Sequence, residues 1–211
     1  MQLQGTTVVA LTKARETGPQ NLMQLWMGEI GISEVMPRYS ALAKSGFVYT
    51  ARSALQTLAL AGTAMTGLVV WNSSAGSQAN AVDLHILKIS GDVAVTSATL
   101  TGIALARGTG QSTAPTSTTA SSSYGNNYLG GSAGAAIAYS VATLATAPVA
   151  MFDVMHNTAA ISTTGEDVGF YEDLEGVIVV PPGGVICFVA LGAASAASAV
   201  NLGMMWAELP V

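Results

Sequence analysis

The chain has 211 residues and a formal net charge of −5, and only 9% of its residues are Asp, Glu, Lys or Arg, while 50% are hydrophobic. So many apolar residues with so few charges exclude intrinsic disorder, and the acidic balance argues against a nucleic-acid-binding protein, which needs a basic surface. Because a surface poor in charge favours association, we expect the chain to bind copies of itself or another protein.

The N-terminal sequence does not predict export. The apolar run Val8–Leu11 is too short for a secretion signal, and Lys13 and Arg15 follow it rather than precede it. Ser, Thr, Gly or Asn interrupts every apolar run before it reaches the roughly 18 residues of a spanning helix. We therefore expect a protein made in the cytoplasm that has neither a membrane nor a nucleic acid as its partner.

Residues 1–45 are expected to form an N-terminal arm, because they lack the alternation typical of strands. Short helices are predicted over residues 21–26 and 38–43. The arm carries Met, Trp and Arg side chains of the kind enriched in interfaces, and the interface candidates are Arg15, Met23, Trp26, Met27 and Arg38. The alternative is an irregular segment that covers one end of its own sandwich.

From residue 46 onward, runs of β-branched, aliphatic and aromatic residues alternate with turn residues about every ten positions, which is typical of an all-β sandwich. The inward positions of one run change from even to odd numbers after Ile86, which predicts a β-bulge or a change of sheet. Leu202, Met204 and Trp206 alternate and are expected to line the core. The predicted strands span residues 46–51, 56–61, 67–72, 81–89, 94–106, 149–155, 176–180, 185–191 and 200–208.

No charged side chain occurs from residue 108 to residue 152, a stretch rich in Ser, Thr, Ala and Gly. This composition is typical of a flexible linker, but small side chains also allow close packing against a neighbouring subunit. We favour the second interpretation. The sequence thus predicts one sandwich domain over residues 46–211, with an extended low-charge insertion over residues 108–147.

Charge is divided unevenly along the chain. The seven Lys and Arg side chains all lie within residues 1–107, whereas seven of the twelve acidic side chains lie after residue 107. A cluster of acids whose spacing lacks the ligand ladder of a calcium loop indicates a solvated loop, with Ca²⁺ binding as the weaker alternative. Its members are Glu166, Asp167, Glu172, Asp173 and Glu175. We expect the last three to form an interface with Arg15 and Arg38 of another copy, although pairing of these charges within one chain would look identical in sequence.

Three residues are suited to acid–base or nucleophilic chemistry near neutral pH: His85, His156 and the single cysteine, Cys187. They are scattered, and the sequence contains no nucleophile elbow, phosphate loop or metal-ligand spacing. Cys187 is expected to be a small buried hydrophobe. The sequence therefore predicts no enzyme, no cofactor, no metal site and no small-molecule substrate.

Four segments carry a family resemblance: Met36–Tyr39 with Gly46–Tyr49, Thr66–Asn72 with the loop Ala75–Ser77, Val180–Gly184, and Trp206–Val211. Over residues 36–211 their arrangement resembles virion structural proteins of tailed bacteriophages, whose body is similar to a single jelly roll. The resemblance implies a structural protein of the virion, such as a capsid decoration or cement protein, a head fibre or a tail protein. Such a protein is expected to self-associate as a trimer or larger ring and to bind a larger lattice of other virion proteins.

Jelly rolls also serve as lectins, so the alternative function is a receptor- or glycan-binding module of a phage fibre or tail spike. A site of that kind needs clustered aromatic and polar side chains on loops. The sequence offers one such cluster, made of Tyr124, Asn126, Asn127 and Tyr128.

Overall fold

The computed structural model describes residues 25–27, 33–35, 38–74, 81–95, 102–108, 113–121, 123–156, 168–192 and 198–211. The chain divides into two compact units, Met1–Gly46 and Phe47–Val211, one residue after the boundary expected from the sequence. Within the described ranges, no helix has the length and apolar character needed to cross a membrane.

The first unit contains a short antiparallel pair of strands and a helix. Strand β1 (Leu25–Met27) pairs with β2 (Ser33–Val35), and helix α2 (Arg38–Lys44) follows. The helix predicted over residues 38–43 is confirmed, and Gly46, with φ at 76°, ends it with a hydrogen bond from its N–H to the carbonyl of Ala43. The helix predicted over residues 21–26 is wrong where the structure describes it. Residues 25 and 26 pair as a strand with residues 35 and 34.

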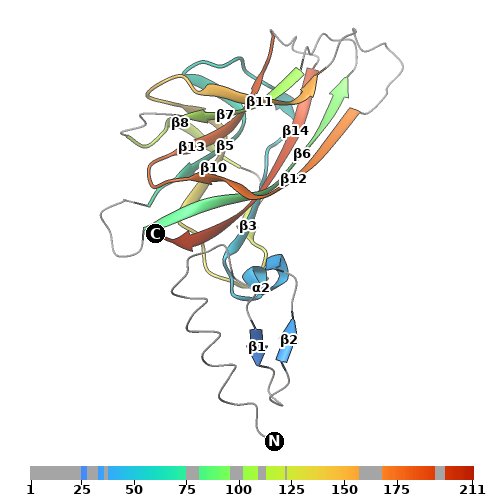
Figure 1. Ribbon diagram of the computed structural model, residues 1–211. Coiled ribbons are helices and arrows are strands. Elements are labelled where there is room, and N and C mark those ends of the chain that lie inside the picture. Colours follow the sequence, from blue (N-terminus) through green and yellow to red (C-terminus); the bar gives the residue numbers. More distant parts are fainter. Residues whose placement is uncertain are drawn as a thin grey trace, which may run out of the picture. The chain divides into compact units, whose positions relative to one another are not determined.

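The second unit is a sandwich of two antiparallel sheets, which confirms the all-β sandwich (Figure 1). The sheet that contains β5 has the order β11-β7-β13-β5-β10-β8, and we call it the β5 sheet. The β6 sheet has the order β12-β6-β14-β3-β9, with β4 also paired to β14. The strands are β3 (Val48–Arg52), β4 (Gln56–Thr57), β5 (Ala64–Asn72), β6 (Val82–Val95), β7 (Gly102–Gly108), β8 (Thr116–Ala120), β9 (Ser123–Asn126), β10 (Ala136–Thr143), β11 (Val149–His156), β12 (Val168–Val180), β13 (Val185–Ala190) and β14 (Ser198–Pro210).

The strand pairing is nested in the manner of a jelly roll. Strand β7 pairs with β11, β6 with β12, and β5 with β13. Strands β5, β6 and β7 alternate between the two sheets, and so do β11, β12, β13 and β14. A long hairpin rolled across two sheets produces this pattern. Strands β8, β9 and β10 lie between β7 and β11 in sequence, so they occupy the place of the hairpin tip.

These three strands correct the expectation of an extended insertion over residues 108–147. Strand β10 pairs with β5, and β8 extends the same sheet beyond β10, while β9 pairs with β3. In β10, small side chains occupy the buried alternate positions, and they are Ala136, Ala138, Ser140 and Ala142. The small residues of β10 therefore pack into the chain's own sandwich, whereas all five residues of β8 are exposed, and packing of the segment against a neighbouring subunit stays a prediction.

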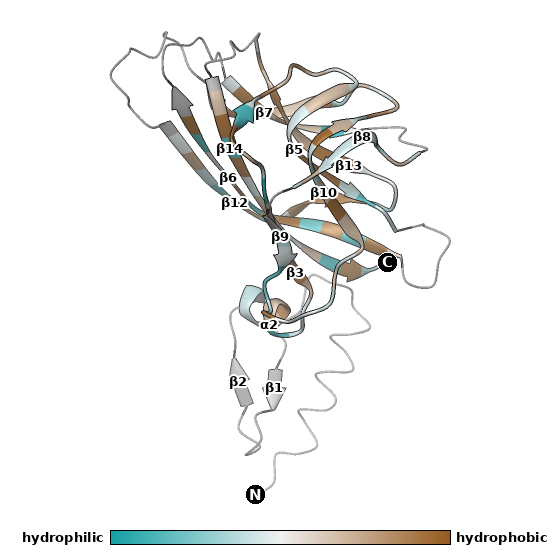
Figure 2. Cartoon of the chain, turned by 180° about the vertical axis from the view of Figure 1, so that it is seen from behind, coloured by the Kyte–Doolittle hydropathy of each residue, from teal (hydrophilic) through white to brown (hydrophobic). Residues whose placement is uncertain are grey.

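The core lies between the two sheets and follows the period-two pattern predicted for the last strand. Leu202, Met204 and Trp206 are all buried, which confirms that prediction. In Figure 2, brown and teal segments follow one another along the strands of the β6 sheet. A second apolar cluster lies on the opposite face of the β5 sheet, where Val185, Cys187 and Val189 alternate with the inward residues of β13.

The predicted irregularity near Ile86 is a β-bulge. Ile86 pairs with Trp206 and Lys88 with Met205, so Leu87 is the extra residue on β6. Ile86 and Leu87 are both buried, which explains why the inward positions change from even to odd numbers. The strand predicted over residues 94–106 is wrong as one element, because β6 continues to Val95 and β7 begins at Gly102.

Candidate functional site

A site with exposed apolar side chains lies on β11 and β12, which are outer strands of the β5 sheet and the β6 sheet and contact each other. Each strand has one strand partner among the described residues, β7 for β11 and β6 for β12. Large hydrophobic side chains stand exposed along both strands: Val149, Met151 and Phe152 on β11, and Val177 and Val179 on β12. We call these five residues the edge strip. An exposed apolar edge of this kind is a template for association.

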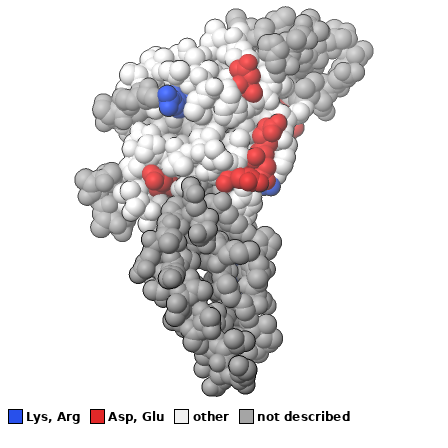
Figure 3. Space-filling view, viewed as in Figure 1, with Lys and Arg blue, Asp and Glu red and all other residues white. Residues whose placement is uncertain are grey.

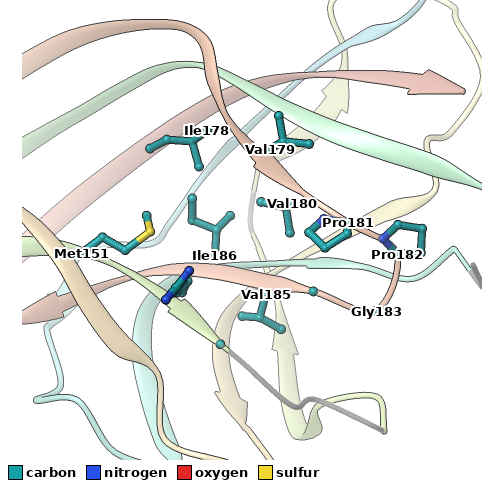
Figure 4. A pocket seen from close by; sticks show the side chains of 12 residues that line it. Met151, Ile178, Val179, Val180, Pro181, Pro182, Gly183, Val185 and Ile186 are labelled. Atoms are coloured by element: carbon teal, nitrogen blue, oxygen red, sulfur yellow. The ribbon is translucent and has the colours of Figure 1, made fainter. Parts of the chain in front are cut away.

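A groove of about 440 Å³ opens beside the edge strip, and Met151 and Val179 of the strip belong to its lining. Figure 4 shows Met151, Ile178 and Ile186 around one end, and Pro181 and Pro182 at the other. The side chain of Arg107, exposed at the end of β7, supplies the one charged group of the lining. The groove is therefore an apolar recess whose chemistry suits an aliphatic or aromatic side chain.

A rigid turn between β12 and β13 shapes one end of the groove. Gly183 has φ at 74° and its N–H donates to the carbonyl of Asn72 at 2.9 Å, while the N–H of Gly184 donates to the carbonyl of Pro181 at 2.9 Å. The buried Asn72 amide also donates to the carbonyls of Val82 and Val180. These hydrogen bonds join β5, β6 and β12 at the turn, so the groove is preformed.

The acidic residues expected in a loop lie instead on a strand. Glu172, Asp173 and Glu175 belong to β12, whereas Glu166 and Asp167 lie outside the described residues. The prediction of a loop was wrong because the acids occupy the exposed positions of an edge strand, which tolerates charge. Figure 3 shows acidic side chains gathered in a streak on this face. Asp173 forms an ion pair of 3.3 Å with Lys88.

Only some of the N-terminal interface candidates lie among the described residues. Trp26 and Met27 lie in β1, and Arg38 begins α2, but their side chains are not among those described. Arg15 and Met23 lie outside the described residues. The expected contact between this basic arm and the acids of β12 in another copy stays a prediction.

The sequence-based glycan candidates lie on β9 and the turn after it, and most of their polar groups are engaged within the chain. The Tyr124 hydroxyl donates to the carbonyl of Ala136 at 2.7 Å, and its ring stacks on Trp206 at 5.9 Å. Burial, with the nearby Glu208 carboxylate, raises the pKa of Tyr124 to about 12. Asn127 accepts from the Thr50 hydroxyl, and Asn126 accepts from the N–H of Tyr128. Tyr128 is exposed, and glycan binding by these four residues stays a prediction.

The three residues considered for catalysis are not brought together. His85 lies on β6, whereas His156 and Cys187 lie on β11 and β13 of the other sheet. Cys187 is fully buried, and burial raises the pKa of its thiol to about 12. Among the described residues, no group of three or more His, Cys, Asp or Glu side chains is arranged to hold a metal ion.

The edge strip was not predicted from the sequence, because residues 149–155 and 176–180 have the pattern of ordinary strands. Their position at the sheet edges depends on pairing with strands that are distant in the sequence. The apolar residues on both faces of Val149–Met155 were the available signal. Comparison with protein-family models, curated proteins and solved structures finds no match.

Proposed function

We propose that the chain is a structural subunit rather than an enzyme, and that it assembles by covering its edge strip with another protein molecule, first of all a second copy. The observation that carries this proposal is the exposed apolar edge strip with its preformed groove. Val177 is 84% exposed and Val149 55% exposed, on strands that stay in contact with water unless a partner covers them.

The energetics favour such an assembly. Full burial of one Val, Met or Phe side chain contributes about 1.5–3 kcal/mol relative to exposure. The five side chains of the edge strip are uncharged, so their burial desolvates no charge, while the exposed acids Glu172, Asp173 and Glu175 of β12 must stay in water or meet basic groups of the partner. Edge strands also offer unpaired backbone groups, so a neighbour can extend the sheet by hydrogen bonding.

The setting proposed for this assembly is a bacteriophage virion. The support is the resemblance of residues 36–211 to virion structural proteins of tailed phages, together with the jelly-roll pairing of the strands. Within that setting the subunit forms a trimer or larger ring, binds other virion proteins of the capsid or tail, and stabilises the particle passively through buried interface area.

The test is the mass of the purified full chain by light scattering over a range of concentrations. We expect an oligomer for the natural chain and a monomer for a variant that combines Val177→Lys with Val179→Lys, because two charges in the edge strip must be desolvated on association. Leu55→Lys is the matched control, since Leu55 is an exposed hydrophobic residue in a bend and not on the edge strip.

A monomeric natural chain at micromolar concentration would contradict the proposal. So would an oligomer that persists unchanged in the double variant.

A further inference from the structure

A second groove, of about 300 Å³, lies on the outer face of the β6 sheet, away from the edge groove. The strand register explains why it forms. Arg52, Gly203, Ser90 and Tyr171 stand side by side in one row across β3, β14, β6 and β12. Gly203 and Ser90, in the centre of the row, are small, and we call them the floor of the groove. The long side chains of Arg52 and Tyr171 stand on either side, and we call them its two walls.

The floor is kept low by close packing. A Cβ atom added to Gly203 would lie 2.6 Å from Oγ of Ser90, so no larger residue fits there without displacing the serine. The thioether of Met205, in the next row, adds an apolar surface to the groove. The hydroxyl of Ser90 points into the same space as the Gly203 surface and forms no hydrogen bond with the described residues.

The first wall is a polar cluster. Arg52 donates through Nε to Oδ1 of Asn201 at 2.7 Å and through Nη2 to Oδ2 of Asp92 at 3.1 Å. Asn201 and Asp92 face each other in the row next to that of Arg52. A guanidinium, a carboxylate and an amide therefore converge at one end of the groove, and the side chains of Arg52 and Asp92 are 54% and 69% exposed.

The second wall is an aromatic ring held in place. Tyr171 is 63% exposed, and Nζ of Lys88 lies 2.7 Å from its hydroxyl and 5.2 Å from the ring centroid. Lys88 also pairs with Asp173 at 3.3 Å. These contacts fix the orientation of the ring, so a ligand meets a preorganised aromatic surface.

The charges of the groove decide the class of ligand. Arg52 is balanced by Asp92 and Lys88 by Asp173, so neither an anion nor a cation finds an uncompensated opposite charge. Once the charges are balanced, the groove offers neighbouring hydrogen-bond donors and acceptors on Arg52, Asp92 and Asn201. Beside them lie the apolar surfaces of the Tyr171 ring and the Met205 thioether. A sugar ring presents vicinal hydroxyls at its rim and C–H groups on its face, which matches both features.

We propose that this groove binds a neutral carbohydrate, with its C–H face on Tyr171 and Met205 and its hydroxyls on Arg52, Asp92, Asn201 and Ser90. This site differs from the sequence-based cluster around Tyr124, and it goes beyond assembly through the edge strip. A particle subunit with such a groove on its outer face would also attach to glycans.

The test uses the purified full chain and a panel of neutral saccharides, namely glucose, galactose, mannose, N-acetylglucosamine and their disaccharides. Saturation-transfer NMR screens the panel, and calorimetry measures the affinity of the sugars that bind. We expect saturable binding of at least one sugar, weakened about tenfold or more by Tyr171→Ala, which removes the aromatic wall, and by Ser90→Leu, which fills the floor. Tyr171→Phe is expected to retain most of the affinity because the ring remains.

Tyr128→Ala is the matched control, since Tyr128 is an exposed tyrosine outside the groove. Circular dichroism and thermal unfolding verify that each variant is folded, and Ser90→Leu keeps the test decisive if Tyr171→Ala does not fold. The proposal is overturned if no sugar of the panel binds, or if Tyr128→Ala weakens binding as much as the groove variants do. The edge variant Val177→Lys with Val179→Lys should keep its sugar affinity, so failure of assembly and failure of sugar binding are distinguishable.

Discussion

At the scale of single residues, the carboxylate of Glu208 is the least expected member of the core. It is 5% exposed and accepts hydrogen bonds from the N–H groups of Ala135 at 2.7 Å and Ala136 at 2.9 Å, and from Nε1 of Trp206 at 3.3 Å. A Cβ on Gly134 would collide with this carboxylate, so glycine there lets the backbone approach. Glu208 therefore holds the uncharged segment before β10 against the last strand.

We predict that Glu208→Leu lowers the free energy of unfolding by about 2–4 kcal/mol, because two backbone N–H groups lose their acceptor in a buried place. Glu208→Gln, which keeps one acceptor oxygen, should cost less. Urea unfolding of the two variants measures the difference. Glu172→Gln, at an exposed carboxylate, serves as the control, and an equal loss there would contradict the assignment.

At the scale of elements, β12 shows a departure from regular strand geometry. Asp173 pairs with Lys88 and Ile178 with Ile86, so four residues of β12 stand opposite the single residue Leu87. Glu175 and Gly176 within this bulge have φ at 51° and 80°. The bulge turns Val177 outward into the edge strip, where it is 84% exposed.

Gly176→Val should destabilise the sandwich by about 1–2 kcal/mol, because a β-branched residue rarely adopts positive φ. Thermal unfolding of the purified variant tests this. Gly125→Ala is the matched comparison, since a Cβ at Gly125 meets nothing within 4 Å and its φ is not positive, and it should leave the unfolding midpoint nearly unchanged. A larger loss at Gly125 than at Gly176 would refute the role of backbone conformation.

The local sequence pattern predicted the strands in which apolar and polar residues alternate strongly. It failed where the residue types of a segment are unusual for the place that the segment occupies in the fold. The core positions of β14 follow from period two, and the same alternation places Glu208 inward, although residue type alone argues for exposure. The acids of β12 read as a loop because nothing local shows that they sit on an edge strand. Strand β10 was not predicted from the sequence, because alanines that fill a tight interior give the same composition as a linker. The two grooves depend on which strands become neighbours, and that is decided by pairing across the whole chain.

At the scale of the whole molecule, the buried thiol of Cys187 and the half-buried phenol of Tyr124 link folding to pH. Burial raises the pKa of Cys187 from 9.0 to about 12 and that of Tyr124 from 10.0 to about 12. Above about pH 9 the unfolded chain releases these protons while the folded chain keeps them. Folding stability is therefore fully retained below about pH 9 with respect to these groups, and falls as the pH rises toward 12.

We predict that urea unfolding midpoints decline between pH 9 and pH 11, each retained proton contributing at most about 1.4 kcal/mol per pH unit. Cys187→Ala should show a shallower decline over the same range, whatever its stability at neutral pH. Equal slopes for the natural chain and the variant would show that the thiol does not remain protonated in the fold.

The position of β14 in the centre of the β6 sheet matters for how the molecule is made. It separates β6 from β3, although residues 198–210 follow both strands by a long stretch of chain. During translation, β3 and β6 are synthesised before β14, so the strand that pairs with both of them is not yet present. The β6 sheet of the nascent polypeptide is therefore completed only after translation has passed Pro210. A premature stop before β14 would leave the β12-β6 half and the β3-β9 half of this sheet without the strand that joins them, and such a chain would be open to proteolysis.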